Sequence, residues 1–296
     1  MRGIPMRPNA TKLTVIEPGL RSLVQDSGRR GWAHLGVGRS GAADRPAMAL
    51  ANRLVGNEQG AAVVEVTNGG LELWFDASTW VAVTGAPLSV RVGARARWTH
   101  EPIAVDAGDV VRLGVPQRGL RSYLAVRGGL LVDPVLGSRS TDLMSGLGPS
   151  PLRPGDVLPV GLSHGPVPVA DVVASAMLAA PDEDVVLPVQ CGPRAEWFEP
   201  EAVDLLLGER FEVTADSDRI GVRLAGPALP RRIQRELASE GVVEGSVQAP
   251  PGGRLTLFGP DHPVTGGYPV IAVVPSRALA PVAQLRPGQG VRFRRA

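Results

Sequence analysis

The sequence predicts a mainly β fold with a few short helices, on two observations. Glycine and proline are abundant, with 37 and 28 residues in a chain of 296, although they stay below the range typical of disordered chains. Between these turn formers, short aliphatic segments recur in which apolar and polar residues alternate. Many short strands at such spacing are typical of barrels and sandwiches. The hydrophobic content of 44% is enough for substantial cores, in one large domain or two of ordinary size.

The first half of the chain carries the clearest series of strands. Asn68-Gly69 is a hairpin turn signal between two of them. A glycine turn precedes a short apolar strand three times, at Gly108, Gly155 and Gly288. The strands are expected at residues 12–17, 61–66, 70–75, 80–84, 88–92, 109–115 and 121–126.

One helix is expected directly after a glycine-rich loop. Asp44 is a good N-cap, and Pro46 is tolerated in the first turn. Apolar residues then recur at helical spacing, so one face is buried, and Gly56 is placed to end the helix. The apolar positions are Ala47, Leu50, Ala51 and Leu54.

A change in composition separates two predicted domains. Residues 163–184 are rich in alanine and valine and lack strand alternation, so we expect a linker with one helical segment. The second half restarts with a strand at residues 185–189, and a helix opens at Glu199 and stops at Gly208. The predicted division is an N-terminal lobe at 12–165, a linker at 166–184 and a C-terminal lobe at 185–295.

The stretch from residue 23 to residue 70 is the first candidate site. Five glycines fall within fourteen residues, with polar side chains between them. Glycine lets backbone N–H groups approach a ligand, and a glycine-rich loop that runs into a helix N-terminus favours an anion. An irregular surface loop with local Asp–Arg pairs fits the residue types equally well. The polar candidates are Gln25, Asp26, Arg29, Ser40 and Asp44.

A second polar cluster, at residues 137–142, follows shortly after a glycine pair. Its hydroxyls and its arginine suit an anion or an oxyanion, although a turn with an exposed arginine is the simpler interpretation. The candidates are Ser138, Arg139 and Ser140.

A third candidate stretch is Thr265-Gly266-Gly267-Tyr268, with Gln248 upstream. Its backbone N–H groups, hydroxyl and aromatic face could hold a flat polar ring or a phosphate. The simpler interpretation is a tight turn that closes two strands.

Composition argues against several classes of function. The net charge is +2 and no basic stripe interleaves with aromatics, so we expect no nucleic-acid partner. Lys12 is the only lysine, so there is no Walker loop, and its surroundings are not a biotinylation sequence. No apolar segment reaches transmembrane length and no signal peptide opens the chain, which predicts a cytoplasmic protein without membrane contact.

Cysteine and histidine give no sign of a metal centre. Cys191 is the single cysteine, which rules out a disulfide within the chain, and we expect it to be a buried small hydrophobe. The four histidines are scattered and none stands at metal-ligand spacing to another, so no metal site is expected.

Several separated motifs occur in one order along the chain. They are Gln25-Asp26-x-Gly28-Arg29, Ser40-Gly41-Ala42-x-Asp44, Ala51-Asn52-x-Leu54-Val55-Gly56-Asn57, Gly137-Ser138-Arg139-Ser140-Thr141, Gly192-Pro193 with Trp197-Phe198, Ser217-Asp218-Arg219, Ser239-Glu240-Gly241, and Asp261 with Thr265-Gly266-Gly267-Tyr268-Pro269. Together these motifs resemble the KipA family, also called allophanate hydrolase subunit 2 or the C subunit of 5-oxoprolinase. The resemblance covers residues 13–294, and the family is similar to part of the carboxyltransferase region of urea carboxylase.

This resemblance implies two cyclophilin-like β-barrel lobes and a heteromeric complex. The implied partner is a KipI-like protein, equivalent to allophanate hydrolase subunit 1 or the 5-oxoprolinase B subunit, with the 5-oxoprolinase A subunit as a third component. The implied reaction is the opening of the 5-oxoproline lactam to L-glutamate, driven by ATP with Mg accompanying the nucleotide. Phosphorylation of the amide oxygen makes a leaving group, after which water can add.

The resemblance also suggests roles for the candidate residues. Arg29, Arg139 and the amides of Gly266 and Gly267 would stabilise developing charge. The catalytic candidates are Asp26 and Asp44, for proton handling or metal–phosphate contact, together with Arg29 and Arg139. The substrate-binding candidates are Gln25, Ser40, Ser138, Ser140, Gln248, Thr265, Gly266, Gly267 and Tyr268.

Two alternative functions stay open. One is a carboxyltransferase or allophanate hydrolase subunit 2 type component, acting on urea-like substrates with biotin carried by another protein. The other is a non-catalytic regulator that binds a KipI-like kinase inhibitor. The sequence departs from the family at Pro263-Val264, where polar residues are usual, and at residues 252–255, which bears on the substrate more than on the fold.

Overall fold

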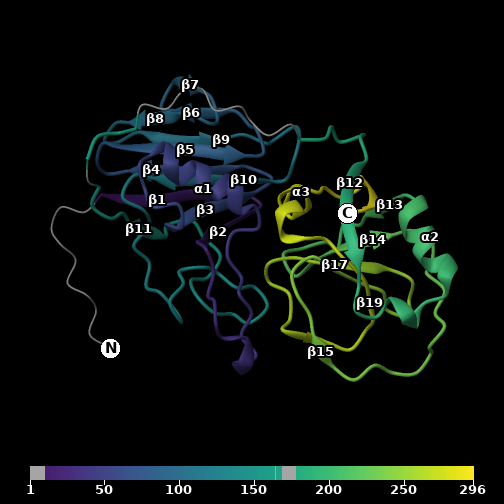
Figure 1. The fold of residues 1–296 in the computed structure, drawn as a ribbon. Helices are drawn as coiled ribbons and strands as arrows, with labels where there is room; N and C mark the ends of the chain where they lie inside the picture. The colour runs from purple at the N-terminus through teal and green to yellow at the C-terminus, as the bar shows by residue number, and fades with distance from the viewer. Residues whose placement is uncertain (1–10, 164, 169–177) are drawn as a thin grey trace.

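The computed structural model describes residues 11–163, 165–168 and 178–296, and within these ranges the protein is mainly β with short helices (Figure 1). This confirms the prediction of a mainly β fold with a few short helices. The helical segment expected in the linker falls largely on residues 169–177 and lies outside the described residues. No helix in the described ranges is long and apolar enough to cross a membrane.

Strands β1 to β11 form two sheets that share one core, and we call this unit the N-terminal lobe. The six-stranded sheet has the order β11-β1-β4-β9-β6-β7, and the five-stranded sheet has the order β2-β3-β10-β5-β8. The strands are β1 (Lys12–Pro18), β2 (Arg21–Gln25), β3 (Val63–Thr67), β4 (Leu71–Phe75), β5 (Thr79–Gly85), β6 (Val90–Val92), β7 (Arg95–Arg97), β8 (Pro102–Val105), β9 (Val110–Leu113), β10 (Arg121–Val126) and β11 (Val157–Pro159).

Helix α1 (Arg45–Leu54) covers the five-stranded sheet on the face away from the shared core. Met48 and Ala51 of the helix cluster with Ala82 and Ala125 of the sheet. Strand β10 is therefore buried at every residue, because it has the core on one face and the helix on the other. The predicted N-cap is confirmed: the Asp44 carboxylate accepts a hydrogen bond from the Ala47 amide at 3.0 Å.

The hairpin predicted at Asn68-Gly69 is wrong. Both residues have positive φ, 59° and 71°, as the turn signal requires. The turn, however, joins β3 of the five-stranded sheet to β4 of the six-stranded sheet, and these two strands do not pair. A tight turn fixes the local reversal of the chain, whereas the burial of apolar faces decides which strands become neighbours.

Strands β12 to β20 belong to the second unit, which we call the C-terminal lobe. Its closed barrel has the order β12-β19-β16-β17-β14-β13-β20, and β12 and β20 close it in parallel. Helix α2 (Pro200–Gly208) and the one-turn helix α3 (Ala280–Ala283) lie beside it (Figure 1). The strands are β12 (Val185–Cys191), β13 (Phe211–Val213), β14 (Gly221–Ala225), β15 (Glu240–Gly241), β16 (Ser246–Gln248), β17 (Leu255–Phe258), β18 (Thr265–Gly266), β19 (Val270–Val273) and β20 (Gly290–Arg295).

The implied pair of barrels is thus corrected to one closed barrel in the C-terminal lobe, beside the two-stranded sheet β15-β18, and two open sheets in the N-terminal lobe. In the N-terminal lobe the sheets stack face to face over a common core, and their pairing does not close into a ring. The core of the barrel is a separate cluster drawn from residues 187–293. The division of the chain into lobes at 12–165 and 185–295, with a linker at 166–184, stays a prediction.

Two smaller expectations have opposite outcomes. The three glycine turns are confirmed, since Gly108, Gly155 and Gly288 have φ of 88°, 88° and 85° just before β9, β11 and β20. The burial expected for Cys191 is wrong, because its side chain is exposed. Cys191 ends β12, whose burial alternates only as far as Val189.

Candidate functional site

The glycine-rich loop runs from the end of β2 to the start of α1, and its base is closely packed. Arg29 donates its amide to the Arg39 carbonyl at 2.8 Å, and Ala42 donates to the Asp26 carbonyl at 2.9 Å. Gly41 has a φ of 93°, and a Cβ there would lie 2.9 Å from the Gly28 nitrogen. Only glycine fits this conformation without strain. Figure 1 shows the loop, in dark purple, extending away from the sheets.

Asp26 joins this loop to the second polar cluster. Its carboxylate accepts hydrogen bonds from the Gly28 amide at 2.7 Å and from the Arg139 amide at 2.6 Å. It also accepts from the hydroxyls of Ser138 and Ser140, each at 2.6 Å. The structure therefore brings together four of the predicted site residues. The Asp26 carboxylate accepts four hydrogen bonds in all.

Arg29 and Gln25 are buried beside this junction, and neither has all its polar atoms paired. Arg29 donates Nη2 to the Ser140 carbonyl and lies 3.7 Å from the Asp142 carboxylate, while its Nε and Nη1 have no hydrogen-bond partner. Gln25 donates to the Thr141 carbonyl at 2.8 Å, while its Oε1 is unpaired. Both side chains are inaccessible, with Arg29 1% exposed and Gln25 0%.

Arg219 of the C-terminal lobe connects the two lobes. Its guanidinium donates two hydrogen bonds to the Asp261 carboxylate, from Nε to Oδ2 at 2.8 Å and from Nη2 to Oδ1 at 2.9 Å. Nη2 also donates to the Gly41 carbonyl at 2.6 Å, and Nη1 pairs with Glu65. Asp261 in turn accepts the Ser40 hydroxyl at 2.7 Å. The predicted site residue Ser40 is thus held by a carboxylate from the other lobe.

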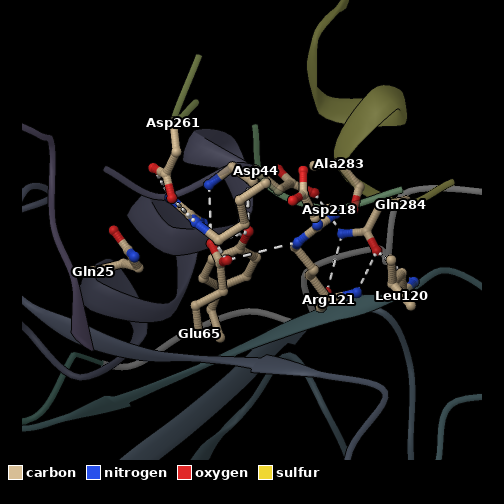
Figure 2. Close-up of polar contacts among 12 residues, drawn as sticks. Gln25, Asp44, Glu65, Leu120, Arg121, Asp218, Asp261, Ala283 and Gln284 are labelled. Carbon is tan, nitrogen blue, oxygen red and sulfur yellow. Dashed lines mark hydrogen bonds and ion pairs between the residues drawn. The ribbon is translucent and has the colours of Figure 1, made fainter. Parts of the chain in front are cut away.

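A second set of contacts between the lobes lies next to the first (Figure 2). Gln284 donates Nε2 to the Asp44 carboxylate at 2.8 Å and accepts the Arg121 amide at 3.0 Å. Tyr123 donates its hydroxyl to Glu65 at 3.0 Å and accepts the Asp44 amide at 2.7 Å. Asp44 therefore belongs to this network and to the helix cap, and not to the junction around Asp26.

Burial and neighbouring charges shift three ionisable groups in this network. Burial raises the pKa of Asp44, and the charge of Glu65 adds to the effect against the opposing hydrogen bond from Gln284. Burial and the charges of Glu65 and Asp44 raise the pKa of Tyr123 well above its usual value. Burial alone would lower the pKa of Arg219, but Glu65 and Asp261 outweigh it and raise the pKa. Arg219 and Tyr123 are therefore held in their protonated forms.

The third candidate stretch lies apart from both networks. Thr265 and Gly266 form β18, which pairs with β15. Gln248 donates to the Tyr268 carbonyl at 2.9 Å, and Tyr268 is 48% exposed. Within the described ranges, no hydrogen bond or ion pair joins residues 265–268 to Asp26 or Arg29. The three stretches thus form a buried junction and a separate, open segment.

One small cavity lies where the two lobes meet. Its volume is about 20 Å³, and it is lined by Arg121, Asp218, Glu244, Phe258 and Leu279 among others. That volume suits a water molecule and is far too small for a nucleotide. In the part of the chain that the structure describes, no group of three or more His, Cys, Asp or Glu side chains could hold a metal ion.

Sequence reasoning missed several residues that organise the site. Glu65 carried a signal, because it is a carboxylate inside the apolar strand β3 and is fully buried. Arg219 and Asp261 stood in motifs without an assigned role. Arg121, Tyr123 and Gln284 carried no local signal, since their importance depends on what packs against them.

Comparison with known proteins shows the family of this chain. The family model of the carboxyltransferase domain, subdomain A and B, matches residues 35–295. The C subunit of the 5-oxoprolinase of Escherichia coli (strain K12) is 38% identical over 284 residues, which make up 95% of this chain and 90% of that protein.

Two solved structures extend the likeness to the fold. The crystal structure of the K. lactis urea amidolyase is 30% identical with a TM-score of 0.89, over 98% of this chain and 19% of that one. The crystal structure of TTHA0988 is 35% identical with a TM-score of 0.86, over 98% of this chain and 57% of that one. The chain thus spans little more than half of one solved relative and a fifth of the other. These matches confirm the resemblance seen in the motifs, and the protein belongs to the family of the carboxyltransferase domain, subdomain A and B.

Proposed function

We propose that the protein is the C subunit of a 5-oxoprolinase, a complex that opens 5-oxoproline to L-glutamate with ATP. The observation that carries this proposal is the 38% identity to a protein of that name, over 95% of this chain and 90% of the other. The partners would be a KipI-like protein, as the B subunit of the complex, and its A subunit. A cytoplasmic location belongs to the proposal, because the reaction consumes ATP.

The geometry supports a division of labour among the predicted residues. We assign Asp26, Ser138 and Ser140 to positioning, because the Asp26 carboxylate is fully occupied in tying two loops together. We assign Asp44 to the contact between the lobes rather than to a metal or phosphate, since Ala47 and Gln284 already bind its two oxygens. Thr265, Gly266, Gly267 and Tyr268 remain the substrate-facing candidates, because Thr265 and Tyr268 are exposed.

ATP would supply the phosphoryl group that turns the lactam oxygen into a leaving group. This chain's own contribution would be to bind and orient the lactam and to stabilise the charge that develops on it. Backbone donors and arginines suit that task, and the chain supplies both beside its glycine-rich loop.

The test is to co-purify this chain with its neighbouring subunits and measure glutamate and ADP formed from 5-oxoproline and ATP. We expect the two products in a coupled ratio, lost when this chain is omitted and strongly reduced by Asp26→Asn. The matched control is Asp133→Asn, at an exposed position near the second polar cluster. An assembled complex that releases no glutamate would overturn the proposal.

The second candidate function is carboxyl transfer with biotin carried by another protein. It is favoured by the matching family model and by the TM-score of 0.89 to a urea amidolyase. It predicts carboxybiotin-dependent turnover of a urea-like substrate by the same complex. A third outcome, in which the chain only sequesters a KipI-like kinase inhibitor, predicts that no substitution at the Asp26 junction matters once the complex has formed.

A further inference from the structure

Three arginines form a cluster where the glycine-rich loop meets the C-terminal lobe, because the charges of Arg30 and Arg45 both act on Arg39 and Arg45 contacts Glu244. Arg45 pairs with Glu244 at 2.6 Å. Within the described ranges, Arg30 and Arg39 pair with no carboxylate. The cluster therefore holds three cations against one anion.

In the arginine cluster, one guanidinium is held in place by hydrogen bonds, and another has a buried nitrogen without a hydrogen-bond partner. Arg39 is half-buried and directs both Nε and Nη2 at the Ser27 carbonyl, at 3.3 and 3.2 Å, which fixes the plane of its guanidinium. The Nε of Arg45 is buried without a hydrogen-bond partner. Burial first, and then the charges of Arg45 and Arg30, lower the pKa of Arg39 to about 10. An anion among these groups would relieve their mutual repulsion.

The position of the arginine cluster relates it to the substrate-facing candidates. A Cβ on Gly38 would lie 3.2 Å from the His262 carbonyl, so the loop touches the turn that leads into β18. Glu244, the partner of Arg45, lies between β15 and β16, the strand that carries Gln248. The cluster thus borders both segments that carry Gln248 and Tyr268.

We propose that Arg39, together with Arg30 and Arg45, forms an anion site that binds the carboxylate of the lactam substrate. This rests on the proposed function and adds to it the residues that recognise the acid group. Of the arginines first considered, Arg29 is fully buried and is therefore less suited to contact a ligand. Arg139 belongs to the second polar cluster, where its Nε donates to the Val132 carbonyl at 2.8 Å. A guanidinium fork matches a planar carboxylate with two parallel hydrogen bonds.

The test compares 5-oxoproline with 2-pyrrolidone, the same lactam without a carboxylate. In the assembled complex, Arg39→Gln should raise the KM for 5-oxoproline at least about tenfold, the factor that corresponds to one lost charged contact, with the KM for ATP unchanged within about twofold. Arg39→Lys should show an intermediate KM. The matched control is Arg53→Gln, at an exposed position on α1.

Each result decides between named alternatives. If Arg39→Gln raises the KM for ATP instead, the site holds a phosphate and the carboxylate proposal fails. An unchanged KM for 5-oxoproline also overturns it. If the wild-type complex releases no glutamate, the proposed function fails, and the anion site is then judged by calorimetry on the same complex. In that measurement 5-oxoproline must bind more tightly than 2-pyrrolidone, and Arg39→Gln must remove the difference.

Discussion

Arg219 binds both carboxylate oxygens of Asp261, with Nε to Oδ2 at 2.8 Å and Nη2 to Oδ1 at 2.9 Å. The pair is almost completely buried, and it also reaches the N-terminal lobe at Gly41, Glu65 and Ser40. A bidentate pair of this kind fixes orientation as well as distance. Its effect here is to set the glycine-rich loop against the barrel.

Removing the cation of this pair should destabilise the protein strongly. Arg219→Leu would leave the carboxylates of Glu65 and Asp261 buried without their partner, which costs about 3–5 kcal/mol. Urea denaturation measures the free energy of unfolding. The control is Arg254→Leu, because Arg254 is 68% exposed and its ion pair with Asp216 is long, at 3.6 Å. A loss below about 1 kcal/mol for Arg219→Leu would contradict the role given to the pair.

Two glycines of the same loop offer a matched comparison of close packing. Gly41 and Gly31 have φ of 93° and 91°, so alanine is strained to a similar extent at both. A Cβ at Gly41 would lie 2.9 Å from the Gly28 nitrogen, whereas a Cβ at Gly31 meets nothing within 4 Å. We expect Gly41→Ala to lower the melting temperature clearly more than Gly31→Ala. Equal shifts would mean that the loop opens at no cost.

The buried carboxyl of Asp44 should make stability depend on pH. Burial raises its folded pKa above the usual 3.8, so the folded chain keeps this proton to a higher pH than the unfolded chain. The stabilisation is complete below the unfolded pKa and is lost as pH rises through the folded pKa. Asp44→Asn removes the titration and keeps a good N-cap.

This dependence can be measured as a difference in the free energy of unfolding. The free energy of unfolding of the wild type, minus that of Asp44→Asn, should fall as pH is raised from about 4 towards neutrality. Asp204→Asn, at an exposed position on α2, provides the control for changes common to the whole protein. A difference that rises with pH would contradict the direction of the shift.

Asp26 should matter for the order of the second polar cluster. In Asp26→Asn the side-chain amide replaces one of two oxygens that together accept four hydrogen bonds. At least one donor would lose its acceptor, at a cost of about 1–3 kcal/mol. Hydrogen exchange at residues 137–142 should become faster, while exchange in α2 stays unchanged. Unaltered exchange would show that these loops hold together without the carboxylate.

The local parts of this structure could be predicted from the sequence, and for local reasons. Alternating apolar residues marked the strands, and Asp44 marked the start of α1, because each pattern acts within a few residues. The Asn68-Gly69 turn was also found, but its consequence was not. Sheet membership depends on which apolar faces meet, and no short window of sequence contains that information.

The contacts between the lobes could not be predicted in this way. Glu65 meets Arg219 across 154 positions of sequence, and Asp44 meets Gln284 across 240. Family motifs pointed to Asp26, Ser138 and Ser140, and the structure brings them together. The motifs could not tell a carboxylate that is free to react from one that is fully hydrogen-bonded, because that distinction depends on the packing around it.

The turn at Asn68-Gly69 is one of several places where the chain leaves one sheet for the other. Strands β1, β4, β6, β7, β9 and β11 build the first sheet, and β2, β3, β5, β8 and β10 build the second. Strand β11 completes the first sheet by pairing residues 157–159 with residues 12–14. A nascent chain on the ribosome therefore cannot complete the second sheet before β10 has emerged, nor the first sheet before β11 has emerged. Such a topology favours slow folding and leaves unpaired strand edges exposed during synthesis.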